Sequence, residues 1–132
     1  MSRETTQLVQ RFYDGLNEGN LEGAMSVCDP LVVVYTRPDQ LSAIAPRGQR
    51  RVADYLRDWL ESWDEYHTEL EELREAGDQV VVLVRARARG KGSRFYAHAE
   101  TADVFAVRDG KITSLRLYVD RAEALSVVRE RD

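Results

Sequence analysis

Residues 98–125, HAETADVFAVRDGKITSLRLYVDRAEAL, decide the fold of this chain, because they read as a strand, a tight turn, a second strand and the start of a helix. Asp109 and Gly110 tolerate the positive backbone dihedrals of a two-residue hairpin turn, and alternating apolar and polar residues flank them on both sides. The stretch therefore predicts an antiparallel hairpin in which Arg108 faces Lys111.

The register of this hairpin follows by counting outward from the turn, which pairs Asp103 with Arg116 and Ala102 with Leu117. The opposite charges of the first pair favour this register by roughly 0.2 to 1 kcal/mol. One face of the hairpin is then predicted to bear His98, Glu100, Ala102, Val104, Leu115, Leu117 and Val119. The other face is predicted to bear Thr101, Asp103, Phe105, Ser114, Arg116 and Tyr118. We expect the first of these two faces to line a cavity.

The rest of the chain supplies helices first and strands afterwards. Apolar residues at helical spacing predict helices over 4–18, 21–28 and 48–63, and Asn20 and Asp120 are placed to cap the second helix and a closing helix. Strands are predicted over 31–35, 66–76, 79–89, 94–107 and 111–119, and a loop over 36–47. This order predicts an α+β fold in which three N-terminal helices pack on a curved, mostly antiparallel sheet and leave a cone-shaped cavity.

Composition narrows the range of partners. At 132 residues and 43% hydrophobic content, the chain fits one domain spanning residues 1–132. A net charge of -4 argues against nucleic-acid or anionic-membrane binding, which needs a basic surface. The single cysteine, Cys28, lies in an apolar helical stretch and is expected to be a small buried thiol, which favours a reducing compartment. Without a signal-peptide pattern or an apolar run of about 18 residues, the expected location is cytoplasmic.

Three stretches resemble the SnoaL-like and ketosteroid isomerase-like members of the nuclear transport factor 2-like superfamily. They are LVQRFYDGLNEGNLEGAM at 8–25, Gly48 at the start of the third helix, and VRDGKITSLRLYVDRAEAL at 107–125. The resemblance covers nearly the whole chain and implies a cone-shaped α+β barrel with no cofactor. This fold serves isomerases, cyclases, epoxide hydrolases, dehydratases and non-catalytic domains, so it does not by itself fix an activity.

The positions that carry the best-known chemistries of these relatives differ here. Ketosteroid isomerases use a tyrosine on the first helix and a protonated aspartic acid as an oxyanion hole, and an aspartate on the first strand to move the proton. The resemblance places Phe12, Ala102 and Tyr35 at these positions, and none of the three can do that work. In SnoaL-type cyclases and limonene epoxide hydrolases, a pocket aspartate lies on the last strand, at the position of Leu117. The resemblance therefore implies the pocket without these mechanisms.

His98 and Glu100 are the candidate catalytic residues. They lie two apart on one strand, so they share a face, and in the counted register that face lines the cavity. A carboxylate beside an imidazole raises its pKa and holds its orientation, which suits a general acid or base near pH 7. Two alternatives remain open: the pair lies solvated or bound to an arginine at the rim, or it orients a ligand without reacting.

Aromatic residues are the candidate ligand-binding wall. Trp59 and Trp63 lie four apart on one helical face, and the predicted lining residues are Phe12, Tyr13, Tyr55, Trp59, Trp63, Ala102 and Leu117. The alternative is that the aromatic residues are ordinary core. Tyr35 and Arg37 are candidates to close the mouth over a polar ligand group, with a surface loop as the alternative. With His67 and His98 as the only histidines, no metal site is predicted.

The outer face of the sheet is the candidate dimer surface. Arg85, Arg87 and Arg89 alternate with small residues, so their strand is basic on one side, which we expect to face outward as a solvated face or a dimer contact, with an anion site as the alternative. Phe105 and Tyr118, on the outer face in the counted register, form a half-apolar surface that a second copy of the chain would cover. A homodimer through this face is therefore expected.

Three functions follow as hypotheses. The first is a SnoaL-like pocket protein that binds a small apolar metabolite, and the second is an isomerase, cyclase or dehydratase in which His98 and Glu100 transfer protons. The third is a non-catalytic dimeric association module whose cavity is filled by its own side chains. None of the three requires a cofactor.

Overall fold

A computed structural model describes residues 3–36 and 45–131 of the chain. Helices form at α1 (Arg3–Glu18), α2 (Leu21–Met25), α3 (Gln49–Glu61) and α4 (Arg121–Arg131). Strands form at β1 (Cys28–Tyr35), β2 (Trp63–Ala76), β3 (Gln79–Gly90), β4 (Tyr96–Arg108) and β5 (Lys111–Tyr118). The α+β class is confirmed, although α2 ends earlier, and β1 and β2 begin earlier, than the sequence patterns predict.

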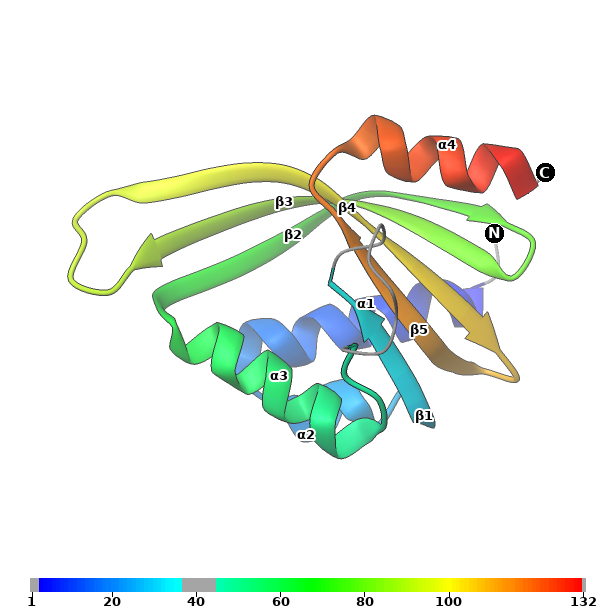
Figure 1. Cartoon of the computed structure of the whole chain (residues 1–132), viewed down its shortest axis with the longest axis horizontal. Helices are drawn as coiled ribbons and strands as arrows, with labels where there is room; N and C mark the ends of the chain where they lie inside the picture. The colour runs from blue at the N-terminus through cyan, green and yellow to red at the C-terminus, as the bar shows by residue number, and fades with distance from the viewer. Residues whose placement is uncertain (1–2, 37–44, 132) are drawn as a thin grey trace.

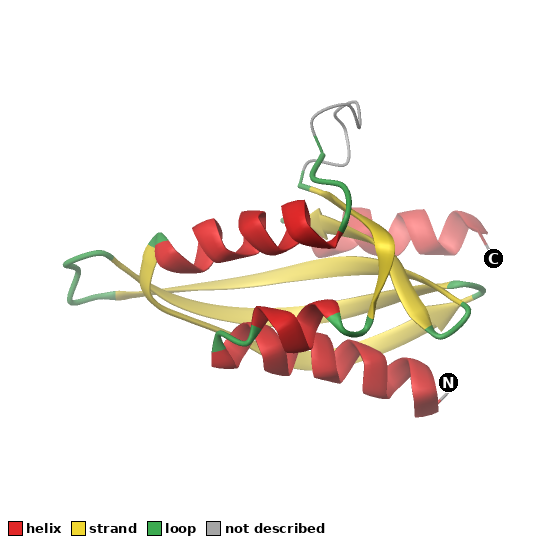
Figure 2. Cartoon of the chain, turned by 90° about the horizontal axis from the view of Figure 1, so that it is seen from below, coloured by secondary structure: helices red, strands yellow, loops and turns green. Residues whose placement is uncertain are grey.

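The strands form one sheet in the order β1-β5-β4-β3-β2. All neighbours are antiparallel except β1 and β5, which are parallel. Figure 1 shows that the sheet curves over α1, α2 and α3, and that α4 lies across the opposite side. We call the side covered by α1 to α3 the inner face and the other side the outer face. The β3–β4 hairpin extends past the helices at one end of the sheet (Figure 2).

The first two helices meet at a glycine. A Cβ atom at Gly15 would lie 2.8 Å from the backbone nitrogen of Ala24, so α2 can approach α1 this closely only because residue 15 has no side chain. Asn20 caps α2, as predicted, by accepting a hydrogen bond of 2.9 Å from the backbone N–H of Gly23. Together, α1 and α2 present one apolar stripe to the inner face of the sheet.

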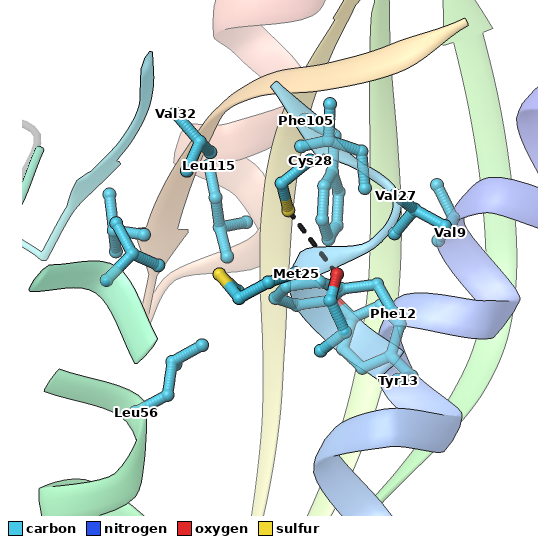
Figure 3. Packing of buried hydrophobic residues seen from close by; sticks show 14 of the residues in the cluster. Val9, Phe12, Tyr13, Met25, Val27, Cys28, Val32, Leu56, Phe105 and Leu115 are labelled. Carbon is cyan, nitrogen blue, oxygen red and sulfur yellow. Dashed lines mark hydrogen bonds between the residues drawn. The ribbon is translucent and has the colours of Figure 1, made fainter. Parts of the chain in front are cut away.

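The main core lies between that stripe and the sheet. Phe12, Tyr13 and Phe105 pack edge to face with ring centroids 5.5 to 5.7 Å apart, and Figure 3 shows them grouped with Cys28 and the aliphatic residues of β1 and β5. Cys28 is buried, as predicted, and burial raises the pKa of its thiol to about 12. The thiol is therefore a packing group and not a nucleophile at neutral pH.

A smaller core lies on the outer face beneath α4. Ala124 of α4 is fully buried there against Val81, Ala102 and Val104. Arg121 fixes the start of the helix, because its guanidinium donates hydrogen bonds to the backbone carbonyls of both strands below it, at 2.9 and 3.0 Å. The helix α4 thus covers part of the outer face and shields it from solvent.

The hairpin register predicted from the sequence is wrong by one residue. The turn itself is confirmed, with Arg108 opposite Lys111 and positive φ at both loop residues. Beyond it, Ala106 pairs with Ser114 while the next residue of β4 pairs with Ile112, so Thr113 has no partner and forms a β-bulge. The Thr113 hydroxyl donates a hydrogen bond of 3.2 Å to the carbonyl of Ala106. The prediction failed because it assumed an unbroken ladder.

A one-residue slip exchanges the two faces of a strand. Asp103 now pairs with Leu117 instead of Arg116, and Ala102 pairs with Tyr118 instead of Leu117. Phe105, expected on the surface, turns to the inner face and is 0% exposed, while Tyr118 stays on the outer face but is only 5% exposed, because it packs beneath α4. The predicted ion pair across the hairpin and the predicted apolar dimer surface are therefore both wrong. No helix of the described chain is long and apolar enough to cross a membrane.

Candidate functional site

A cavity of about 480 Å³ lies between the inner face and the helices. The helices contribute Phe12, Leu16, Tyr55, Leu56, Trp59 and Leu60 to its wall, and the sheet contributes Val84, Ala86, Ala88, Ala97, Ala99 and Leu117. The space exists because β3 and β4 carry alanines at the positions that face the bulky residues of α3. A cavity filled by its own side chains, as the association-module hypothesis required, is therefore wrong.

One wall of the cavity is an aromatic cluster formed by Trp59, Trp63 and Tyr66. The Trp59 ring lies 5.5 Å from the Trp63 ring and 5.8 Å from the Tyr66 ring, measured between centroids, in edge-to-face geometry. The Trp63 indole N–H is buried and finds no hydrogen-bond partner among the described residues. Burial raises the pKa of the Tyr66 phenol, so this wall is uncharged at neutral pH.

The polar end of the cavity is a hydrogen-bonded pair, Tyr13 and Asp103. The Tyr13 hydroxyl, from α1, donates to Oδ2 of Asp103, from β4. Burial raises the pKa of Asp103 from 3.8 to about 6, although the Tyr13 hydrogen bond works in the other direction. Burial and the neighbouring carboxylate hold the pKa of Tyr13 well above its usual value. The pair therefore carries at most one negative charge near neutral pH.

Asp103 is inaccessible from the outer face but not wholly covered. The residue keeps part of its surface exposed, and it lines the cavity. No lysine or arginine is among the described residues that line the cavity. Among the described lining residues, this carboxyl is thus the only acidic group, and the other polar side chains there are mainly hydroxyls and phenols.

Asn17 fixes β2 against α1 beside this pair. Its side-chain amide donates to the Thr68 carbonyl at 2.8 Å, and its side-chain oxygen accepts from the Thr68 N–H at 2.9 Å. The Thr68 hydroxyl adds a third bond at 3.0 Å. Because Thr68 also lines the cavity, Asn17 positions one edge of the site.

Most of the predicted lining residues do line the cavity: Phe12, Tyr13, Tyr55, Trp59, Trp63 and Leu117. Ala102 does not, because the bulge turns it to the outer face, where it packs under α4. Tyr35 lies outside the described lining and stacks against Arg116, whose guanidinium carbon is 5.0 Å from the ring centroid. Arg37 lies outside the described residues.

The expected pair of His98 and Glu100 does not point into the cavity. Antiparallel partners share a face, and these residues pair with Arg87 and Arg85 on the outer face. Glu100 is 61% exposed and forms ion pairs with Arg85 and Arg121, with N···O distances of 3.8 and 3.7 Å. His98 borders the cavity between two inward alanines, so it contributes main chain there. His98 and Glu100 were expected to face inward because the sequence-based register lacked the bulge at Thr113, which exchanges the two faces of β4.

Asp103 is the site residue that sequence reasoning missed. A signal for it exists in β5, where the apolar residues Ile112, Leu115 and Leu117 break strict alternation, and Ile112 and Leu115 share one core. A spacing of three between two inward residues requires an extra residue in the strand. Including that residue turns Asp103 inward.

Comparison with known proteins agrees with this geometry. A family model, described as a SnoaL-like domain, matches residues 9–115. A solved NTF2-like protein of unknown function from Burkholderia pseudomallei K96243 is 23% identical over 97% of this chain and 98% of its own, with a TM-score of 0.77. No curated protein sequence matches the chain with significance.

Two further solved structures contain small molecules. A protein with a ketosteroid isomerase-like fold from Catenulispora acidiphila DSM 44928, in complex with trimethylamine, is 14% identical, with 92% of each chain covered and a TM-score of 0.75. A Mycobacterium tuberculosis protein in complex with estradiol-17β-hemisuccinate is 14% identical, with 92% of this chain and 97% of that chain covered and a TM-score of 0.73. At these identities the similarity is one of fold.

Proposed function

This chain belongs to the SnoaL-like domain family, and we propose that it is a pocket protein whose cavity binds a small, predominantly apolar molecule. The observation that carries the proposal is the cavity of about 480 Å³, with a mainly aromatic and aliphatic wall and a hydrogen-bonded polar pair, Tyr13 and Asp103, at one end. Small-molecule sites are typically concave, mostly apolar and supplied with a few converging polar groups. The small molecules in the two solved structures of similar fold support the same reading.

The division of the wall suggests how a ligand is held. Its apolar body would lie against Trp59 and Trp63 and over the alanines of β3 and β4, where removing it from water stabilises the complex. Its polar group would meet the Tyr13–Asp103 pair, which fixes its orientation. Affinity would come from the wall, and selectivity from the pair.

Tryptophan fluorescence gives a direct test, because both tryptophans of the chain line the cavity. We expect estradiol, a neutral apolar probe, to produce a saturable change in emission. Ala86→Phe places a ring in the cavity and should weaken binding, while Ala122→Phe places the same ring on an exposed position of α4 and should not. Absence of any saturable change in the wild-type protein, with its melting curve intact, would reject the proposal.

A second candidate is an enzyme that transfers protons through Asp103. A carboxyl with a pKa of about 6, held inside an apolar cavity, is suited to acid or base catalysis near neutral pH. This candidate replaces the acid-base pair predicted on β4, since Glu100 is bound by arginines on the outer face. The reaction class stays that of the sequence hypothesis, a cofactor-independent isomerase, cyclase or dehydratase.

The base-catalysed ring opening of 5-nitrobenzisoxazole tests this second candidate. Asp103 as the base should give a rate that rises as pH increases through about 6, because only the carboxylate accepts a proton. Asp103→Asn should abolish the reaction, and Glu100→Gln, on the same strand but facing outward, should leave it unchanged. A reaction that Glu100→Gln abolishes and Asp103→Asn leaves unchanged would instead assign the proton transfer to His98 and Glu100.

We also propose a homodimer through the part of the outer face that α4 leaves uncovered. There Tyr96 is 44% exposed, and the guanidinium carbon of Arg87 lies 5.2 Å from the centroid of its ring. The surrounding surface alternates acidic residues with arginines, so a second copy of the chain can match it in charge. Light scattering should give a dimeric mass that Arg87→Glu lowers to that of a monomer. A monomeric wild-type protein would end this proposal. A cytoplasmic location likewise stays a prediction.

A further inference from the structure

The cavity has an unbalanced charge. Among the described residues of its wall, Asp103 is the only acidic side chain, and none is a lysine or arginine that could neutralise it. The Tyr13 hydroxyl donates a hydrogen bond to Oδ2 of Asp103. A buried carboxylate normally has a cationic partner or several donors, because water no longer solvates it. Asp103 has a single neutral donor within the part of the chain that the structure describes.

The Asp103 carboxyl is nevertheless ionised in most protein molecules at neutral pH. Burial raises its pKa, but only to about 6, so the anion predominates above that value. Between pH 6 and 8 the cavity wall therefore carries a negative charge at Asp103, of which only Oδ2 is bound by Tyr13 among the described residues. A ligand that brings a positive charge would supply the missing partner, and a ligand with a carboxylate would meet a like charge.

Aromatic rings stand beside this charge. Tyr13 binds the carboxylate directly, and Tyr66 is near enough for the ionised carboxylate to raise the pKa of its phenol further. Tyr66 in turn packs against Trp59 and Trp63, with ring centroids 5.8 and 6.1 Å away. Ring faces attract cations, most strongly where water is excluded, and rings combined with a carboxylate favour ammonium groups over neutral groups of the same shape.

We propose that the molecule bound in this cavity is an amine, with its cationic nitrogen beside Asp103 and its apolar body against the aromatic wall. This inference rests on the proposed function and adds the chemical class of the ligand. Tyr13 orients the carboxylate toward the nitrogen, and Tyr66 lies beside the same position.

Titration of Asp103 should therefore control binding. The titratable side chains that line the cavity with it are the phenols of Tyr13 from α1, Tyr55 from α3 and Tyr66 from β2, and burial raises the pKa of all three, so they are neutral between pH 5 and 8. Tyr118 of β5 also borders the cavity, but its phenol packs in the outer core beneath α4. His98 borders the cavity from β4, but its imidazole belongs to the outer face. A permanent cation should bind the ionised site, so its affinity should fall as pH decreases through about 6.

Phenyltrimethylammonium and tert-butylbenzene form a matched pair of probes, since they share size and shape and differ by one permanent charge. At pH 7.5 we expect the cation to bind at least about 10-fold more tightly than the hydrocarbon, as judged by tryptophan fluorescence. Asp103→Asn should remove most of that difference by weakening the cation alone. Glu100→Gln, which removes an exposed carboxylate from the outer face, should change neither affinity.

The outcomes separate the inference from the proposed function. If tert-butylbenzene binds as tightly as the cation at pH 7.5, or if affinity for the cation does not change between pH 5 and 7.5 in the wild-type protein, the amine proposal is overturned and the apolar pocket stands. If neither probe nor estradiol binds, both proposals are rejected. The pH series needs no variant, so it decides the question even if Asp103→Asn fails to fold.

Discussion

Replacing Asp103 by asparagine should stabilise this protein at neutral pH. The asparagine side chain has nearly the same shape and keeps an oxygen that can accept the Tyr13 hydrogen bond, but it has no charge to bury. In the wild-type protein, folding raises the pKa of this carboxyl from 3.8 to about 6, so the folded state holds a proton that the unfolded state has already lost. Between these pH values the free energy of unfolding must fall as pH rises.

The magnitude follows from that change in pKa. Going from 3.8 to about 6 corresponds to roughly 3 kcal/mol of destabilisation, complete above pH 6 and absent below pH 4. Because Asp103 keeps part of its surface exposed and lines the cavity, where water can enter, we expect roughly 1 to 3 kcal/mol. For a chain of this length that amounts to an increase in Tm of about 3 to 10 °C for the Asn variant at pH 7.5.

Thermal and urea unfolding from pH 3.5 to 8 should show this as a difference between the two proteins. The advantage of Asp103→Asn should be near zero at pH 3.5, grow between pH 4 and 6 and then stay constant. Taking the difference removes the exposed carboxylates, such as Glu71, whose lowered pKa values act in both proteins and in the opposite direction. A variant that is less stable than the wild type at pH 7.5, or a difference that does not depend on pH, would refute this reasoning.

Two further predictions concern the elements that hold the cavity in place. Gly15→Ala should cost about 1 to 3 kcal/mol of unfolding free energy, because its Cβ would lie 2.8 Å from the Ala24 nitrogen. The control Gly90→Ala should cost little, because no atom lies within 4 Å of its Cβ position. Equal effects of the two variants in urea denaturation would contradict the close approach of α1 and α2. Asn17→Ala should cost about 1 to 3 kcal/mol, since it leaves the Thr68 backbone N–H without its partner. Hydrogen exchange should show faster exchange at that amide, and unchanged protection there would refute the role of Asn17.

The sequence was sufficient for the fold because the relevant signals are local. The Asp109–Gly110 turn, the asparagine cap of α2 and the helical stripe of α3 each depend on a few neighbouring residues, and all three appear in the structure. The aromatic wall was also predictable, because two tryptophans four apart on a helix necessarily share a face.

The site was harder to predict because it depends on one residue in the hairpin. Strict counting from the turn exposes Asp103 and turns Ala102 inward, and the bulge at Thr113 reverses both. The apparent charge match of Asp103 with Arg116 made the wrong register attractive. With the bulge included, Asp103 lies on the inner face and accepts the hydrogen bond of Tyr13, whereas the family resemblance pointed to Phe12 and Ala102, each one residue earlier in the chain.

The central claim is that the Asp103 carboxyl lies inside the cavity and forms the polar end of a ligand site. A carbon-13 NMR titration of its side-chain carboxyl tests this most directly, in the free protein and in the presence of estradiol. We expect a pKa of about 6 and a change in the carboxyl resonance when the cavity is filled. A pKa close to 3.8 together with no response to the probe would contradict the account.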